Sequence, residues 1–161
     1  MKKGIPRKAQ RHDTLIIPVE CFGKIKTSEK PDRFSHYHES TELLYINDGE
    51  MKISLRDKPF RLKAGELIVI NSNEPHCLEP ETQECLCYII KFNPELLSSF
   101  NYTLPFTKED PLIFSREFVE GTGIAADISD AVNEWNEKRT GYELAVKADV
   151  LRILRVLITY F

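Results

Sequence analysis

The amino-acid sequence predicts a mainly β domain that ends in helices. Residues 14–92 contain short apolar runs separated by turn residues, and after Pro94 apolar residues recur every three or four positions. Short strands at this spacing are typical of an all-β sandwich or barrel, and the later spacing is typical of amphipathic helices. We therefore expect an N-terminal arm over residues 1–13, a β-barrel over residues 14–100, and a connection with helices over residues 101–161.

Each predicted strand is an apolar run, or an apolar–polar alternation, bounded by turn-forming residues. The clearest is the alternation of Met51, Ile53 and Leu55 with polar residues, which predicts a strand that is buried on one side. Asp48-Gly49, just before it, predicts a tight turn. The strands that this pattern predicts are 15–17, 42–47, 51–55, 60–62, 67–70 and 85–92.

Two long helices are expected after an irregular connection and a short helix that begins at Pro94. The first helix should stop near Gly141, because its apolar residues recur at helical spacing up to that point. Those residues are Ile124, Ile128, Val132 and Trp135.

The second long helix should run from about Leu144 to the end of the chain, with a narrow polar stripe. A helix that is apolar around most of its circumference must be covered on more than one side. We infer that one flank packs on the barrel or on the other helix, and that the other flank packs on a second subunit. A helix pair within a monomer is the alternative. The stripe consists of Lys147, Arg152, Arg155 and Thr159.

Length and charge exclude several classes of protein. The chain has 161 residues and a formal net charge of −3. No apolar run approaches the roughly 18 residues of a membrane span, and no signal peptide opens the sequence. A net negative charge does not provide the basic surface that phosphate binding requires, so any DNA binding by the parent protein must reside in another segment. The arm alone is basic, and we expect its charges to be solvated.

The four cysteines predict neither a zinc ribbon nor disulfide bonds. Their spacing matches no paired-ligand pattern, and a chain of this size needs no disulfides to fold. Cys85 and Cys87 lie two positions apart in a strand-like run and so share one face, where we expect small buried side chains. The predicted location is therefore the cytoplasm. The other two cysteines are Cys21 and Cys77.

The chain ends on an apolar segment, 157–161, without a polar tail. Natural C-termini usually fray into solvent, and this one would expose a tyrosine and a phenylalanine at a helix end. We therefore expect that the natural protein continues beyond Phe161.

Three of the four histidines fall into one pattern with a glutamate. Positions 36, 38 and 42 are even steps apart, so an unbroken strand would direct all three side chains to one face. Two aliphatic residues farther along would share that face, and a histidine on a separate strand could complete the set. Aliphatic walls with a few converging polar groups are typical of a small-molecule pocket. The predicted pocket comprises His36, His38, Glu42, Leu44, Ile46 and His76.

Two interpretations of the polar residues stay open. Imidazole and carboxylate groups are suitable ligands for a divalent first-row metal such as Zn, Ni, Fe or Mn. Alternatively, they form a hydrogen-bonded cluster at the mouth of the barrel that orients a ligand. His12, in the arm, has no such neighbours in the sequence and is expected at the surface. The possible metal ligands are His36, His38, Glu42 and His76.

The spacing of these residues resembles the cupin family. The first cupin motif is complete: His36, one residue, His38, three residues, Glu42, six residues, Gly49. The second motif is partly kept, because its glycine and histidine are present but three positions differ. Those positions are Asn71, Asn73 and Pro80, where cupins usually have proline, glycine and asparagine. The departures leave the barrel prediction intact and weaken the case for a metalloenzyme.

The short sequence segments around the motifs resemble the N-terminal domain of AraC-type transcriptional regulators. The resemblance runs from about His36 to Phe92, and the predicted helix pair also suits the family layout. The segments on which the resemblance rests are Glu42-Leu43-Leu44-Tyr45, Asp48-Gly49, Leu62-Lys63-Ala64-Gly65-Glu66-Leu67 and Asn73-Glu74-Pro75-His76.

This resemblance implies a cupin barrel, a double-stranded β-helix related to the jelly roll, followed by a helical pair. It implies a sensor without enzyme activity, which binds a small-molecule effector such as a sugar and forms a homodimer through the last helix. DNA would be bound only by a helix-turn-helix domain that is absent from this chain. A small metal-dependent cupin enzyme, an oxygenase or isomerase, is the alternative, and a purely structural dimerisation module is a third hypothesis.

Overall fold

Two five-stranded β-sheets and four helices form the part of the chain that the computed structural model describes, which is residues 7–8, 19–23, 35–82, 84–106 and 111–161. The first sheet has the strand order β1-β3-β8-β5-β6, and the second has the order β10-β7-β4-β9-β2. Neighbouring strands are antiparallel except β1 and β3, which are parallel. The bounds are β1 Arg7–Lys8, β2 Val19–Gly23, β3 His36–Tyr37, β4 Thr41–Asp48, β5 Glu50–Leu55, β6 Lys58–Lys63, β7 Leu67–Ile70, β8 His76–Pro80, β9 Leu86–Phe92 and β10 Leu112–Phe114.

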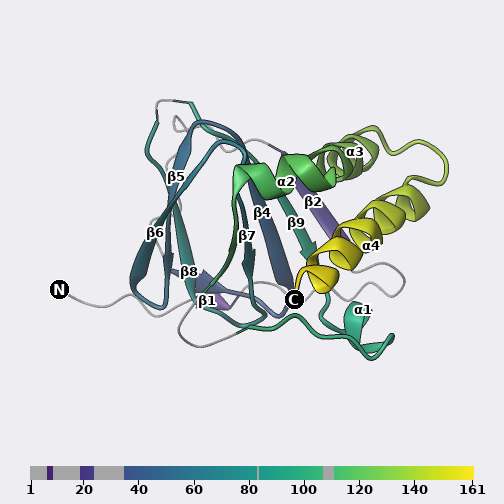
Figure 1. The fold of residues 1–161 in the computed structure, drawn as a ribbon, viewed down its shortest axis with the longest axis horizontal. Coiled ribbons are helices and arrows are strands. Elements are labelled where there is room, and N and C mark those ends of the chain that lie inside the picture. The colour runs from purple at the N-terminus through teal and green to yellow at the C-terminus, as the bar shows by residue number, and fades with distance from the viewer. Residues whose placement is uncertain (1–6, 9–18, 24–34, 83, 107–110) are drawn as a thin grey trace.

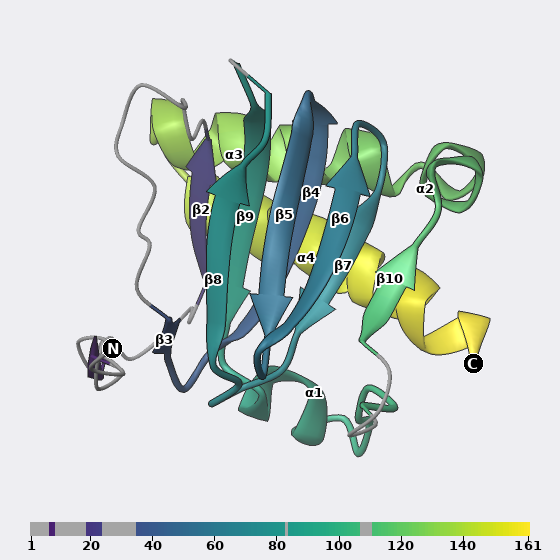
Figure 2. The same cartoon turned by 90° about the vertical axis from the view of Figure 1, so that its left-hand side faces the viewer.

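The molecule has three layers, because the helices cover the outer face of the second sheet (Figure 1). Figure 2 shows the strands face on, with α3 and α4 crossing behind them. Leu44 and Ile46 of β4 are fully buried between the two sheets. Leu43 and Tyr45 point to the opposite face and belong to the core shared with the helices. β4 therefore contributes side chains to both hydrophobic cores, one between the sheets and one beneath the helices.

The sequence predicts five of these strands well. The expected segments 42–47, 51–55, 60–62, 67–70 and 85–92 all coincide with strands of the structure. Met51, Ile53 and Leu55 are buried and alternate with partly exposed residues, as their pattern predicts. Gly49 has a φ of 83° at the predicted turn between β4 and β5, a conformation that favours glycine. The expected segment 15–17 lies outside the described residues.

Two short elements differ from the expected irregular connection. β10 adds to the edge of the second sheet beside β7, and α2 follows it directly. Ser115 caps α2 by accepting a hydrogen bond from the backbone N–H of Phe118. Sheet edge and helix are therefore joined by a single residue.

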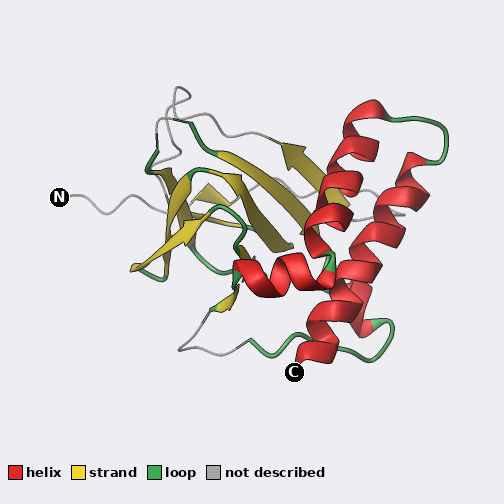
Figure 3. Ribbon diagram, turned by 45° about the horizontal axis from the view of Figure 1, so that its top comes forward, coloured by secondary structure: helices red, strands yellow, loops and turns green. Residues whose placement is uncertain are grey.

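Two long helices pack side by side against the second sheet (Figure 3). The first ends at Glu137 rather than near Gly141, because Lys138 adopts a left-handed φ of 51° and stops it. Gly141 instead precedes the first residue of the last helix. No described helix is long and apolar enough to cross a membrane. The helices are α1 Glu95–Ser98, α2 Arg116–Thr122, α3 Ile124–Glu137 and α4 Tyr142–Tyr160.

Candidate functional site

The histidine–glutamate cluster, which we define as His36, His38, Glu42 and His76, joins the two sheets. His36 and His76 come from paired strands of the first sheet, where their Cα atoms are register partners. Glu42 comes from β4 of the second sheet. The ring centroids of His36 and His76 are 4.3 Å apart, and those of His38 and His76 are 5.2 Å apart. The structure therefore brings together all four polar residues that the sequence predicts.

His36, His38 and Glu42 do not lie on one unbroken strand, the arrangement in which their even spacing would direct all three to one face. β3 ends at Tyr37 and β4 begins at Thr41, so His38 lies in the connection between them. The loop after β7 holds this connection in place. The backbone N–H of Asn73 donates to the carbonyl of His38 at 2.7 Å, and the Ser72 hydroxyl donates to the carbonyl of Glu39 at 2.7 Å. These bonds, rather than strand alternation, direct His38 toward the cluster.

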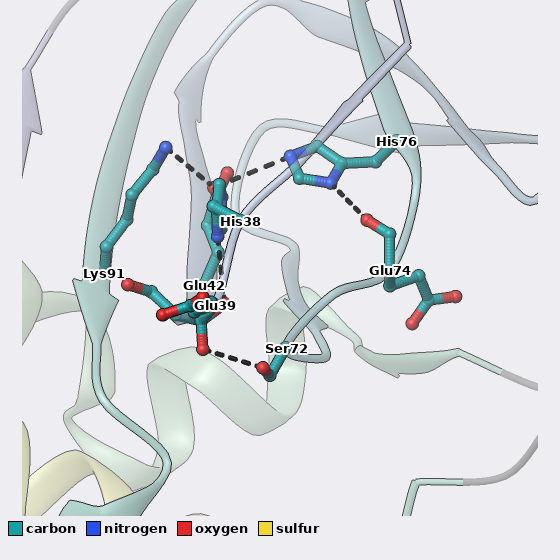
Figure 4. A network of polar contacts seen from close by, with 8 residues as sticks. His38, Glu39, Glu42, Ser72, Glu74, His76 and Lys91 are labelled. Atoms are coloured by element: carbon teal, nitrogen blue, oxygen red, sulfur yellow. Dashed lines mark hydrogen bonds and ion pairs between the residues drawn. The ribbon is translucent and has the colours of Figure 1, made fainter. Parts of the chain in front are cut away.

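Glu42 is the electrostatic centre of the cluster (Figure 4). Its side chain is only 1% exposed, and its Oε2 atom lies 2.9 Å from Nε2 of His38, 3.4 Å from Nζ of Lys91 and 3.7 Å from Nε2 of His76. Burial alone would raise the pKa of Glu42, but the His38 contact and the Lys91 charge lower it to about 2. The carboxylate is therefore ionised at neutral pH, and its Oε1 has no hydrogen-bond partner among the described residues.

Backbone carbonyls fix the orientation of two imidazole rings. Nδ1 of His38 lies 2.9 Å from the carbonyl of Ser40, and Nδ1 of His76 lies 2.8 Å from the carbonyl of Glu74. In the neutral ring of His76, Nδ1–H donates to the Glu74 carbonyl, which assigns the unprotonated nitrogen of that ring to Nε2. Both Nε2 atoms face Glu42: that of His38 donates a hydrogen bond to the carboxylate at 2.9 Å, and that of His76 lies 3.7 Å away with its lone pair unused.

Burial also acts on His76, which is 1% exposed. Its desolvation lowers the pKa of the imidazole to about 4, although the negative charge of Glu42 acts in the opposite direction. His76 is therefore neutral at pH 7, and its Nε2 has no hydrogen-bond partner among the described residues.

The depressed pKa of His76 predicts that acid destabilises the protein well before its carboxylates are protonated. Between pH 6.5 and 4 the unfolded state binds a proton that the folded state excludes, so the free energy of unfolding falls as the pH falls. We expect a loss of about 2 kcal/mol by pH 5, measured by urea unfolding at a series of pH values. His76→Gln should remove most of this dependence. An equal slope in the two proteins would contradict the assignment.

A second group of contacts fixes the loop that carries the Glu74 carbonyl. Arg56, in the turn between β5 and β6, donates from Nε to a Glu74 carboxylate oxygen at 2.7 Å. Its backbone N–H donates to the carbonyl of Pro75 at 3.1 Å. Sequence reasoning missed Arg56 and also Lys91. Lys91 had a signal, because it is the charged residue of an otherwise mostly apolar strand, β9.

The two aliphatic residues of the predicted pocket lie on the expected face of β4. Leu44 and Ile46 follow Glu42 at even steps and are fully buried in the core between the sheets. They therefore lie on the same face of β4 as the histidine–glutamate cluster. Their contact with a ligand stays a prediction.

The residues of the cluster fit a divalent metal ion chemically. One nitrogen from each of His36, His38 and His76 lies within 4.8 Å of the other two. Two nitrogens bound to a tetrahedral zinc ion would be about 3.4 Å apart, so the side chains would have to rotate toward one another to hold it. The unpartnered Oε1 of Glu42 and Nε2 of His76 are both suitable ligand atoms.

The fold and this site define a cupin-type domain: a two-sheet β-barrel with a polar cluster between the sheets and helices on its outer face. Residues 22–154 match the family described as the AraC-like ligand binding domain, and the chain belongs to this family. No curated protein matches its sequence.

Two similar solved structures are of ToxT from Vibrio cholerae strain SCE256. Wild-type ToxT bound to an unsaturated fatty acid has a TM-score of 0.51 at 13% identity, and the match covers 88% of this chain and 55% of that one. The apo form of a lysine-to-alanine variant has a TM-score of 0.55 at 15% identity, with coverage of 94% and 56%. The chain thus spans about half the length of the ToxT chains, and at these identities the likeness concerns the fold.

Proposed function

We propose that this chain is the effector-sensing and dimerising domain of an AraC-type transcriptional regulator. A small molecule would bind in the barrel beside the histidine–glutamate cluster, and its binding would shift the populations of conformations that reach a DNA-binding domain outside this sequence. Membership of a ligand-binding family supports the sensing role. The same membership favours binding over turnover, so we propose no enzyme activity.

The observation that carries the proposal is a pair of buried hydrogen-bond acceptors without partners. Oε1 of Glu42 and Nε2 of His76 are both inaccessible to solvent and lack hydrogen bonds to the described residues. A buried polar atom without a partner costs about 1–3 kcal/mol, and native structures rarely leave one without a functional reason. A ligand with hydroxyl or amine donors would satisfy both atoms. Sugars have such hydroxyl groups and remain the first effector class to test.

Ligand-induced stabilisation tests the sensing role. We would measure the melting temperature with a panel of pentoses, hexoses and, because ToxT was solved with one, unsaturated fatty acids. An effector of this site should stabilise the wild type and lose at least about tenfold in affinity in His76→Leu, which removes an unpaired acceptor. Glu79→Gln, at a half-exposed ion pair, is the control that should bind normally. If a ligand binds the His76 variant as tightly as it binds the Glu79→Gln control, its binding site is not at the cluster.

Dimerisation through α4 is the second part of the proposal. Five residues of this helix recur at steps of four and three, which is the spacing of a coiled-coil seam. They lie opposite the face that packs on the sheet and on α3, which includes Val146, Val150 and Leu157. Leu144 is 72% exposed. We name this set the α4 stripe: Leu144, Ala148, Leu151, Arg155 and Ile158.

A second copy of the chain, in antiparallel orientation, suits the α4 stripe best. In a parallel pair Arg155 would face its own copy, and two like charges would oppose each other. An antiparallel pair centred on Leu151 instead places Arg155 near Ala148 of the other subunit, and Leu144 near Ile158. Each subunit would then bury its exposed leucine without opposing like charges within the stripe.

A metal-dependent cupin enzyme is the second candidate function, and the donor set of the cluster favours it. Three imidazoles and a carboxylate would hold Zn, Ni, Fe or Mn, and a metal bound there would act as a Lewis acid or activate oxygen. In that function the Nδ1 bonds to Ser40 and Glu74 would orient His38 and His76 as ligands. Metal content of the purified protein, and loss of any bound metal in His38→Ala, would separate this function from the sensor.

A further inference from the structure

Lys91 lies directly beside Glu42 in the second sheet. The Cα atoms of the two residues are register partners on β9 and β4, and Nζ of Lys91 is 3.4 Å from Oε2 of Glu42. Glu42 is 1% exposed and Lys91 is 22% exposed, so the ammonium group approaches the carboxylate from the more accessible side. Neither cupin motif includes this lysine, and the proposed function assigns it no role.

We propose that Lys91 sets the selectivity of the cluster by excluding divalent cations from the three histidines and Glu42. Its ammonium group already neutralises the carboxylate that a metal ion would need. A divalent ion on Oε2 would also lie only a few ångströms from Nζ, where two positive charges repel strongly in a site shielded from water. With the lysine present, the cluster is kept for an organic ligand, so the inference belongs to the sensing function and is incompatible with the metal-dependent alternative.

The inference rests on the proposed function, because it specifies what the same site rejects. It differs from a general structural role for the ion pair, since it depends on the charge of residue 91. A second cross-strand pair provides the comparison. Lys52 and Glu79 are register partners on β5 and β8 with Nζ 3.1 Å from Oε2, but both side chains are about 40% exposed. Neither residue belongs to a group of described residues that could hold a metal ion.

Titration with Co²⁺ tests the inference. Calorimetry and the visible absorption of bound Co²⁺ would be measured on metal-free wild type, Lys91→Met, Lys91→Arg and Lys52→Met. We expect Lys91→Met to bind one Co²⁺ at least about tenfold more tightly than the wild type, because a repelling charge is removed while the aliphatic stem is kept. Lys91→Arg restores the charge and should bind as weakly as the wild type. Lys52→Met makes the same change in net charge and should also leave affinity unchanged.

Several outcomes would overturn the inference. They are a Lys91→Met protein that binds Co²⁺ no more tightly than the wild type, and an equal gain in Lys91→Arg or Lys52→Met. Glu42→Gln combined with Lys91→Met should abolish the gain, and its persistence would place the metal elsewhere. If Lys91→Met does not fold, Lys91→Gln provides the same comparison with a polar side chain. None of these results depends on finding an effector, so the sensing proposal stands or fails separately.

Discussion

Replacing Ala148 with arginine is expected to convert the proposed dimer into a monomer without unfolding it. Ala148 is exposed in the middle of the α4 stripe, and arginine is a good helix former, so the subunit itself should tolerate the change. In the antiparallel dimer the new guanidinium group would face Arg155 of the other subunit, and symmetry would repeat this repulsion. We expect the dimer dissociation constant to rise by about 100-fold or more, measured by sedimentation equilibrium over a range of concentrations.

Two further variants show whether the surface and the orientation are correct. Ala126→Arg makes the same substitution at an exposed position of α3 and should leave the dimer intact. Ala148→Glu should stabilise an antiparallel dimer, because it places a carboxylate near Arg155, whereas in a parallel dimer the two glutamates would lie near each other. A wild-type protein that remains monomeric at high concentration would remove the dimerisation proposal, and equal weakening by Ala126→Arg would mean that the effect is not specific to the α4 stripe.

The β-strands were predictable because their signals are local. Alternation at Met51, Ile53 and Leu55, and the apolar run of β7, depend on a few neighbouring residues and on the turns that bound them. β10 lacks such a signal. Its three residues follow Pro111 and become a strand through pairing with β7, more than forty positions earlier in the chain. Pairing over that distance, rather than a local pattern of several residues, makes this segment a strand.

Asp149, near the middle of the last helix, shows a second limit of prediction from the sequence. The sequence predicted that the last helix is apolar apart from four polar residues, which do not include Asp149. In the structure Asp149 is only 5% exposed, between the long helices. Arg152 makes this burial tolerable, because it contacts the carboxylates of both Asp149 and Asp127 of α3. A contact between two helices that depends on their rotation about their axes cannot be inferred from the spacing of either helix alone.

The candidate site was predictable as far as its motif extends. The spacing of His36, His38 and Glu42 fixes which side chains can converge, even though the strand between them is broken. Lys91 joins them through the register of β9 against β4, which is set by the whole sheet. The positive charge that balances Glu42 therefore depends on the pairing of strands in the sheet, which the motif does not describe.

Glu42→Gln is expected to lower the free energy of unfolding by about 3 kcal/mol at pH 7. Removing one partner of a buried ion pair typically costs about 3–5 kcal/mol, and the lower value applies here because Lys91 can turn toward solvent. The variant would also weaken the 2.9 Å contact with His38, since a neutral amide is a weaker acceptor than a carboxylate. Urea unfolding of the wild type and the variant under the same conditions gives this difference directly.

The half-exposed pair of Lys52 and Glu79 is the matched control, and Glu79→Gln should change the free energy of unfolding by less than about 1 kcal/mol. Repeating Glu42→Gln in a Lys91→Met background should cost less than it does in the wild type, because the partner charge is already absent. If Glu42→Gln costs no more than Glu79→Gln, the carboxylate does not organise the cluster. If its cost is the same with and without Lys91, the histidines alone account for the stability that Glu42 contributes, and the ammonium group would be a neighbour without energetic coupling to the site.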